Sequence, residues 1–265
     1  MINTGAAAPS KIHHTAVIDP TAELGEHIST GPYCVIGPRV VLADGITLGS
    51  HVVIEQDTVV GRECRIATGS VLGGDPQDLK YAGQHTELRI GERTQVREYV
   101  TLNRGTATHG CTEIGSDCLI MAYAHVAHDC QIGDHVVIAN AVNMGGHVEI
   151  SDWAVIGGMS AIHQFARIGQ HAFVGGMSAV RKDVPPYVKA SGNPLKLYGL
   201  NSIGLQRRGF PTDVRQELRR AYRLLFQDKL NVHDALARAR AELQPYLEVQ
   251  QLLEFCSRSD RGVTV

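Results

Sequence analysis

The sequence predicts a mainly β protein of 265 residues, in which stacked three-strand coils form a triangular prism that a small α-helical domain follows. An aliphatic residue recurs every six positions from Ile18 to Val180, at 24 of the 28 positions in that frame, and glycine follows a position of the frame 13 times. Six is neither the 3.6-residue period of a helix nor the two-residue period of an ordinary strand. It suits a short strand and a tight turn, in which we expect glycine to accept a positive φ. Three such hexapeptides complete one coil of a parallel β-helix.

The prism is expected over residues 1–190, with two interruptions. Residues 73–89 and residues 103–113 are polar, contain glycine and fall out of the six-residue pattern. Each stretch is either a tolerated surface loop or a functional one. The adjacent Pro185 and Pro186 mark the end of the repeats, because proline cannot donate to a strand ladder.

Residues 191–265 are expected to form the α-helical domain. Helical patterns run from Thr212, as a cap, to Gln227, from the capping residue Asn231 to about Leu243, and from Tyr246 to about Ser257. Residues 186–265 hold 13 basic and 8 acidic side chains, a charge of +5, whereas residues 1–185 hold 12 and 19, a charge of −7. The basic tail fits an anionic partner, and it equally fits solvated helix faces.

Composition and charge exclude several classes of protein. The net charge is −2, so nothing marks the whole chain as a nucleic-acid binder. No window approaches the roughly 20 apolar residues that span a bilayer, and the segment from Met1 to His14 lacks the apolar core of a secretory signal. Four of the six cysteines, at positions 34, 64, 118 and 130, lie two residues before an aliphatic position and suit packing in a reducing compartment. We expect a cytoplasmic protein with no cofactor and no membrane span.

Histidines provide the candidate site. One coil is about 18 residues, so position 128 stacks on 146 and 164, and His147 and His163 miss that line by one residue each. With His125, they bring imidazoles to one corner of the prism, beside Gly145 and Gly146. Three interpretations stay open at this point: a general base, a ladder of histidines along a subunit contact, and a zinc site.

Of these three interpretations, the chemistry of the residues favours a general base. A neutral imidazole can take a proton from an alcohol at neutral pH, and the Gly146 N–H could stabilise an oxyanion. Asp129 adjoins His128, but neighbours on a strand point to opposite faces. The carboxylate can therefore orient the His128 ring only if the chain turns at that point.

Four segments are similar to one family, the UDP-N-acetylglucosamine O-acyltransferases that depend on acyl carrier protein and open lipid A biosynthesis. They are residues 77–81 (QDLKY), 125–130 (HVAHDC), 157–165 (GGMSAIHQF) and 207–210 (RRGF). The similarity runs nearly end to end. It implies a left-handed coil, a homotrimer with sites between adjacent prisms, and transfer of a 3-hydroxyacyl group from acyl carrier protein to the sugar 3-hydroxyl. The phosphopantetheine-bound acyl group and UDP-N-acetylglucosamine would be the substrates.

The resemblance also implies roles for particular residues. His128 would be the general base, supported by Asp129, and Gly146 the oxyanion donor. The cleft would be lined by His125, His147, His163 and Gln164. The sugar nucleotide would be held by Gln77, Asp78 and Lys80 of the first interruption, with its phosphates near Asn201 and Arg207 or Arg208 of the tail. The anionic carrier protein would account for the basic tail.

The sequence departs from this family at two positions. Asn103 stands where the family has a histidine, and Ile203 stands where it has a glutamate that contacts the nucleotide. The first change affects a contact beside the site, and the second removes one hydrogen bond to the ribose or base. At Gly176 the small residue leaves room in the acyl groove, which favours a long acyl chain.

Other functions compete with this one. The sister N-acyltransferases carry a uridine-binding domain before the prism, whereas the repeats here begin by about residue 16. A zinc hydratase similar to the γ-type carbonic anhydrases would use three of the histidines as ligands, but it leaves QDLKY unexplained. A scaffold without catalytic activity would bind neither substrate.

Overall fold

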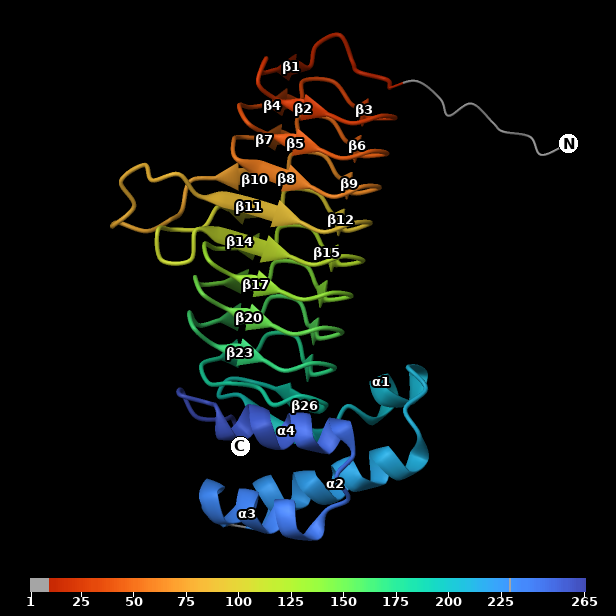
Figure 1. The fold of residues 1–265 in the computed structure, drawn as a ribbon, viewed down its shortest axis with the longest axis vertical. Coiled ribbons are helices and arrows are strands. Elements are labelled where there is room, and N and C mark those ends of the chain that lie inside the picture. The colour runs from red at the N-terminus through yellow and green to blue at the C-terminus, as the bar shows by residue number, and fades with distance from the viewer. Residues whose placement is uncertain (1–9, 229) are drawn as a thin grey trace, which may run out of the picture.

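The computed structural model describes residues 10–228 and 230–265. Residues 1–9, where the first domain and the segment Met1–His14 begin, and residue 229 lie outside the described part. The chain forms the parallel β-helix expected from the six-residue period, with the left hand that the family resemblance implies and the helices at its C-terminal end (Figure 1). Strand pairs join residues 18 apart in the uninterrupted coils, as Val17 pairs with Val35, so each turn of the prism is three hexapeptides long.

Three sheets, parallel except for the antiparallel pair of β26 and β27, form the faces of the prism. The first sheet contains β1 (Val17–Ile18), β4 (Val35–Ile36), β7 (Val53–Ile54), β10 (Val71–Gly74), β13 (Thr101–Asn103), β16 (His125–Val126), β19 (Asn143–Met144), β22 (Ala161–Ile162) and β25 (Ala179–Val180). The second sheet contains β2 (Glu23–Leu24), β5 (Val41–Leu42), β8 (Thr58–Val60), β11 (Glu87–Ile90), β14 (Cys111–Ile114), β17 (Gln131–Ile132), β20 (Glu149–Ile150) and β23 (Arg167–Ile168). The third sheet contains β3 (Ser29–Thr30), β6 (Thr47–Leu48), β9 (Arg65–Ile66), β12 (Gln95–Val96), β15 (Leu119–Ile120), β18 (Val137–Ile138), β21 (Val155–Ile156), β24 (Phe173–Val174), β26 (Val188–Ser191) and β27 (Lys196–Leu200).

The aliphatic residue of each hexapeptide fills the interior of the prism. Ile54, Val126 and Ile156 are fully buried, and even Thr30, the internal exception to the pattern, is only 7% exposed. Because the interior is narrow, aliphatic side chains fill it and large aromatic ones are excluded. The hydrophobic effect acting on this column of side chains stabilises the stack of coils.

Glycine after the aliphatic residue has a different role from the one predicted. Gly37 does not adopt a positive φ, but a Cβ on it would lie 1.6 Å from the carbonyl oxygen of Glu55 in the next coil. Close stacking therefore requires the glycine. The left-handed conformation falls two positions later, on non-glycine residues such as Arg39, with a φ of 56°. Each coil thus places left-handed residues at its corners, which turns their side chains away from the strand direction.

Both interruptions leave the prism at the same corner, where the chain passes from the first sheet to the second. The first loop, residues 75–86, connects β10 to β11, and the second loop, residues 104–110, connects β13 to β14 (Figure 1). They are shorter than the predicted stretches 73–89 and 103–113 because the flanking residues are strand. Residues 87–90 pair in register with residues 111–114.

The chain after the last coil forms an antiparallel pair and four helices. β26 pairs with β27, and the helices are α1 (Ser202–Arg207), α2 (Thr212–Phe226), α3 (Val232–Glu242) and α4 (Leu247–Ser257). The sequence pattern missed β27 and α1. Asn231 caps α3 as expected, but α2 begins after Pro211, and Thr212 is its first residue instead of its cap. Within the described residues, no helix is long and apolar enough to cross a membrane.

Candidate functional site

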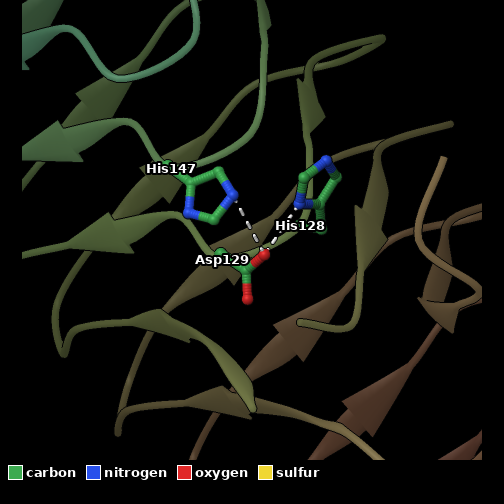
Figure 2. A group of neighbouring side chains, drawn as sticks. All are labelled: His128, Asp129 and His147. Atoms are coloured by element: carbon green, nitrogen blue, oxygen red, sulfur yellow. Dashed lines mark hydrogen bonds and ion pairs between the residues drawn. The ribbon is translucent and has the colours of Figure 1, made fainter. Parts of the chain in front are cut away.

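The prism corner that carries both loops also carries the candidate base. We call it the histidine corner, comprising residues 127–130, 145–148 and 163–166 in three successive coils. Asp129 has a φ of 59°, so the chain turns immediately after His128. The turn brings a carboxylate oxygen, Oδ2 of Asp129, to 2.8 Å from Nδ1 of His128 (Figure 2). The condition for Asp129 to orient the ring is therefore met.

Asp129 is held from several sides. Its side chain is fully buried, and its Oδ1 and Oδ2 accept hydrogen bonds from the backbone N–H and the hydroxyl of Thr106, at 2.8 and 2.7 Å. Burial alone would raise the pKa of Asp129, but the hydrogen bonds from His128 and Thr106 outweigh burial and hold the pKa below its usual value. An ionised Asp129 accepts the Nδ1 proton of His128 and leaves Nε2 of that ring as a proton acceptor.

His147 and His125 flank this pair. Nε2 of His147 lies 3.4 Å from Oδ2 of Asp129, and the His147 and His128 rings meet edge to face with centroids 5.2 Å apart (Figure 2). Nδ1 of His125 lies 2.7 Å from the hydroxyl oxygen of Thr101. Burial lowers the pKa of both His125 and His147, with a smaller lowering effect from neighbouring His128 and, for His147, partial compensation by Asp129. These shifts favour neutral rings beside the base.

Gly146 lies directly under the His128 ring. A Cβ on this glycine would fall 2.3 Å from Cε1 and 2.6 Å from Nε2 of His128, so only glycine leaves the ring in place. Its carbonyl accepts a hydrogen bond from the N–H of Phe165 in the next coil. Within the part of the chain that the structure describes, the Gly146 N–H has no acceptor. A backbone donor therefore lies beside the nitrogen that would take a proton.

The first loop brings Asp78 to this corner. Asp78 accepts hydrogen bonds from the N–H groups of Lys80 and Tyr81, both at 3.0 Å, and it is close enough to His147 to favour that imidazole's protonated form. Gln77 and Lys80 are exposed on the same loop. The loop thus presents a carboxylate, an amide and an ammonium group to solvent next to the histidines.

A residue that sequence reasoning missed, Arg104, anchors the first loop. Its side chain is 1% exposed, and its guanidinium donates to the Gly73 carbonyl, to the Asp75 carboxylate and, at 3.2 Å, to the Tyr81 hydroxyl. Asn103, one of the two departures from the family, is also buried here and donates to the Asp75 carbonyl. A lone arginine in a polar stretch has no distinguishing pattern, so only the topology reveals this role.

We expect Arg104→Met to release the first loop. Several hydrogen bonds from a charged donor are lost, so the free energy of unfolding should fall by about 2–4 kcal/mol. Trypsin should cleave after Lys80 much faster than in the parent protein, and the exposed Arg97→Met should behave like the parent. Equal cleavage rates in the two variants would show that Arg104 does not hold the loop.

His163 and Gln164 lie at the histidine corner, one coil beyond Gly145 and Gly146. Both are exposed. A Cβ on Gly145 would meet the backbone N of Gln164 at 2.9 Å, which shows how closely the two coils stack there. The three imidazoles of His128, His147 and His163 therefore lie on one corner of the prism, although the sequence separates them by up to 35 residues.

Other candidate residues lie on a different face. Asn201 caps α1 and donates at 3.0 Å to the carbonyl of His171, and Arg208 lies over the Trp153 ring, 5.0 Å from its centroid. Burial lowers the pKa of the Arg208 guanidinium. A cavity of about 380 Å³ covers the third sheet there; its lining includes Val155, Phe173, Lys189, Asn201, Ile203, Gly204, Arg207 and Arg208. Ile203 is 67% exposed at this cavity, where it offers an apolar side chain and no acceptor.

Gly176 lies at a third position, the corner where the third sheet leads to the first. A Cβ there would come within 3.1 Å of the Gly158 carbonyl oxygen. Within one chain, Gly176 and His163 lie at different corners of the prism, because they follow strands of different sheets. A single chain therefore brings the first loop next to the histidine corner, but it places Gly176 and the tail residues Asn201, Arg207 and Arg208 elsewhere on the prism.

His128, Asp129 and His147 also offer a possible metal site, since one ligand atom from each lies within 4.8 Å of the others. However, His128 and His147 both contact the same oxygen, Oδ2 of Asp129, the first through a hydrogen bond and the second through an ion pair. The Thr106 hydroxyl donates a hydrogen bond to this oxygen as well. Both carboxylate oxygens already accept hydrogen bonds. The arrangement suits an oriented imidazole better than a set of metal ligands.

Comparisons with known proteins agree with this fold. Residues 111–146 match the bacterial transferase hexapeptide family (six repeats), and residues 183–264 match the family described as UDP-N-acetylglucosamine O-acyltransferase, domain 2. The acyl-[acyl-carrier-protein]–UDP-N-acetylglucosamine O-acyltransferase of Myxococcus xanthus is 45% identical over 96% of this chain and 99% of its own length, and that of Thermodesulfovibrio yellowstonii is 47% identical with the same coverage. The solved structure of LpxA from Acinetobacter baumannii superposes with a TM-score of 0.93 at 42% identity, covering 96% of this chain and 99% of that one.

The hexapeptide prism together with these near full-length relatives defines the class, a β-helical O-acyltransferase. The chain belongs to the acyl-[acyl-carrier-protein]–UDP-N-acetylglucosamine O-acyltransferase family.

Proposed function

We propose that this protein transfers a 3-hydroxyacyl group from acyl carrier protein to the 3-hydroxyl of UDP-N-acetylglucosamine, as the first step of lipid A biosynthesis in the cytoplasm. The near full-length relatives, whose names give acyl carrier protein and UDP-N-acetylglucosamine, support this choice of substrates. The observation that carries the mechanism is the 2.8 Å contact between Nδ1 of His128 and the buried carboxylate of Asp129.

In the proposed step, Nε2 of His128 removes the proton from the sugar hydroxyl. The sugar oxygen attacks the thioester carbonyl and forms the new C–O bond. The resulting oxyanion accepts a hydrogen bond from the Gly146 N–H. Collapse of the intermediate breaks the C–S bond, and the protonated His128 returns the proton to the leaving phosphopantetheine sulfur. Asp129 holds the imidazole in the required tautomer and stabilises its charged form, as carboxylates do in other base-catalysed acyl transfers.

The remaining residues bind the substrates in this proposal. Asp78, Lys80 and Gln77 would hold the sugar, and His125, His147, His163 and Gln164 would line the cleft. The tail residues Asn201, Arg207 and Arg208 would hold the phosphates, because guanidinium groups pair with phosphate oxygens through parallel donors. Gly176 would leave room for the acyl chain.

A homotrimer would complete this site, because one chain places the tail residues and the histidine corner on different faces. An exposed apolar column runs along the Gly176 corner and supports a contact with a second copy. Tyr123 is 63% exposed and stacks on Tyr99, and Met159 and Met177 are 67% and 72% exposed. We expect His128→Ala chains and Arg208→Ala chains, each inactive alone, to regain part of the activity when refolded together. Absence of any recovery in mixed trimers of normal mass would contradict a shared site.

Acyl transfer is tested with radiolabelled UDP-N-acetylglucosamine and a series of 3-hydroxyacyl carrier-protein thioesters. Formation of an O-acylated sugar nucleotide, with a preference among chain lengths, is the expected result. Elemental analysis of protein purified without chelator tests the hydratase alternative, since stoichiometric zinc would favour it. Lack of product and of binding to either substrate would favour a scaffold.

A further inference from the structure

The C-terminal segment reaches back to the histidine corner through Arg261. One nitrogen of its guanidinium, Nη2, lies 3.2 Å from Nδ1 of His163 and 3.3 Å from the carbonyl oxygen of Arg181. These two side chains are 98 residues apart in the sequence. Arg261 also lines a cavity of about 350 Å³ together with Asp129, His147 and Phe165. The last turn of the chain therefore contributes to the same corner as the candidate base.

The segment around Arg261 is firmly attached to the prism. Residues 183 and 263 form a parallel bridge, and the N–H of Thr264 donates to the Asp183 carbonyl at 2.8 Å. The hydroxyl of Ser259 donates at 2.7 Å to the carboxylate of Asp183, which is itself buried. Val263 and Thr264 are also buried. The guanidinium thus lies beside His163 because the backbone on both sides of it is fixed.

The two contacts of Nδ1 of His163 require opposite protonation. Nδ1 also lies 3.0 Å from the backbone carbonyl oxygen of Gln164, a contact that needs a hydrogen on Nδ1. A guanidinium only donates, so its contact needs a lone pair there. Because the charged donor forms the stronger hydrogen bond, Arg261 should win this competition. The proton of a neutral His163 then lies on Nε2.

We propose that Arg261 is a positioning residue that fixes the tautomer of His163, so that Nε2 of this ring donates a hydrogen bond to an oxygen of the acyl donor. This inference rests on the proposed function for the identity of the acceptor. It gives the C-terminal segment a part in acyl transfer that no motif in the sequence indicates.

The tautomer is measured by nitrogen NMR of ¹⁵N-histidine-labelled protein at a pH where His163 is neutral, with the His163 signals assigned by His163→Gln. In the parent protein we expect a hydrogen on Nε2 and none on Nδ1. In Arg261→Met the hydrogen should move to Nδ1, toward the Gln164 carbonyl, and in Arg261→Lys the parent tautomer should largely return. Arg258→Met is the matched control, because Arg258 lies in the same segment but pairs with Glu254.

Activity supplies the second readout. We expect kcat/KM to fall about tenfold in Arg261→Met, the scale of one charge-assisted hydrogen bond, and to recover partly in Arg261→Lys. A parent protein with the hydrogen already on Nδ1, or an unchanged tautomer in Arg261→Met, would overturn the proposal. The NMR measurement needs no substrate, so a parent protein that fails to transfer acyl groups would refute the proposed function and leave the tautomer result intact.

Discussion

Replacing His128 by alanine is expected to lower turnover about 10²- to 10⁴-fold, the usual contribution of a general base. The variant should still fold, because the His128 ring, although only 13% exposed, lies outside the interior column of aliphatic side chains, which is unchanged. Steady-state acyl transfer, measured together with the melting temperature and the oligomeric mass, provides the test.

The exposed His14, in the first coil, offers a matched control for this substitution. His14→Ala should retain the parent rate, because among residues 10–228 and 230–265 its ring contacts only that of His13, at 4.4 Å between centroids. A folded His128→Ala enzyme with the parent's oligomeric mass and near-parent turnover would remove His128 from the mechanism.

Replacing Gly146 by alanine is expected to cost about 10²-fold or more in turnover, with little change in KM. The added methyl would fall 2.3 Å from Cε1 of His128, so the imidazole must move away from its position over the backbone. The Gly146 N–H would then no longer lie beside a correctly placed base, and misplacement of about an ångström is enough to cause a loss of this size.

Gly158→Ala is the matched control for this effect. Gly158 occupies the same step of the hexapeptide at another corner, where a Cβ would lie 3.0 Å from the carbonyl oxygen of Asn140. We expect a much smaller loss there, because no imidazole is displaced. Similar losses in both variants would point to backbone strain instead of displacement of the base.

Much of the architecture follows from periodicity. The six-residue spacing predicts the prism, its interior column and the common corner of His128, His147 and His163, since residues 18 apart must stack. The role of glycine was misassigned, because a sequence pattern does not separate a residue that needs a positive φ from one that has no room for a Cβ. Gly37 belongs to the second kind.

The connections between distant segments could not be predicted in the same way. Arg104 reaches the first loop from the base of the second, and Arg261 reaches His163 from the end of the chain. Neither pair has a fixed sequence spacing. The placement of Asn201 and Arg208 on another face also depends on how β27 and α1 fold over the third sheet, and both elements lie outside the six-residue pattern.

The rate of acyl transfer by Asp129→Asn tests most directly whether a buried carboxylate prepares His128 as the base. An asparagine amide in this place could present an N–H to Nδ1, which would reverse the tautomer and leave a proton on Nε2. We predict a loss of about 10²- to 10⁴-fold in kcat in a folded variant that keeps the parent's oligomeric mass and still binds UDP-N-acetylglucosamine. A folded Asp129→Asn enzyme that turns over within a few-fold of the parent would contradict the account.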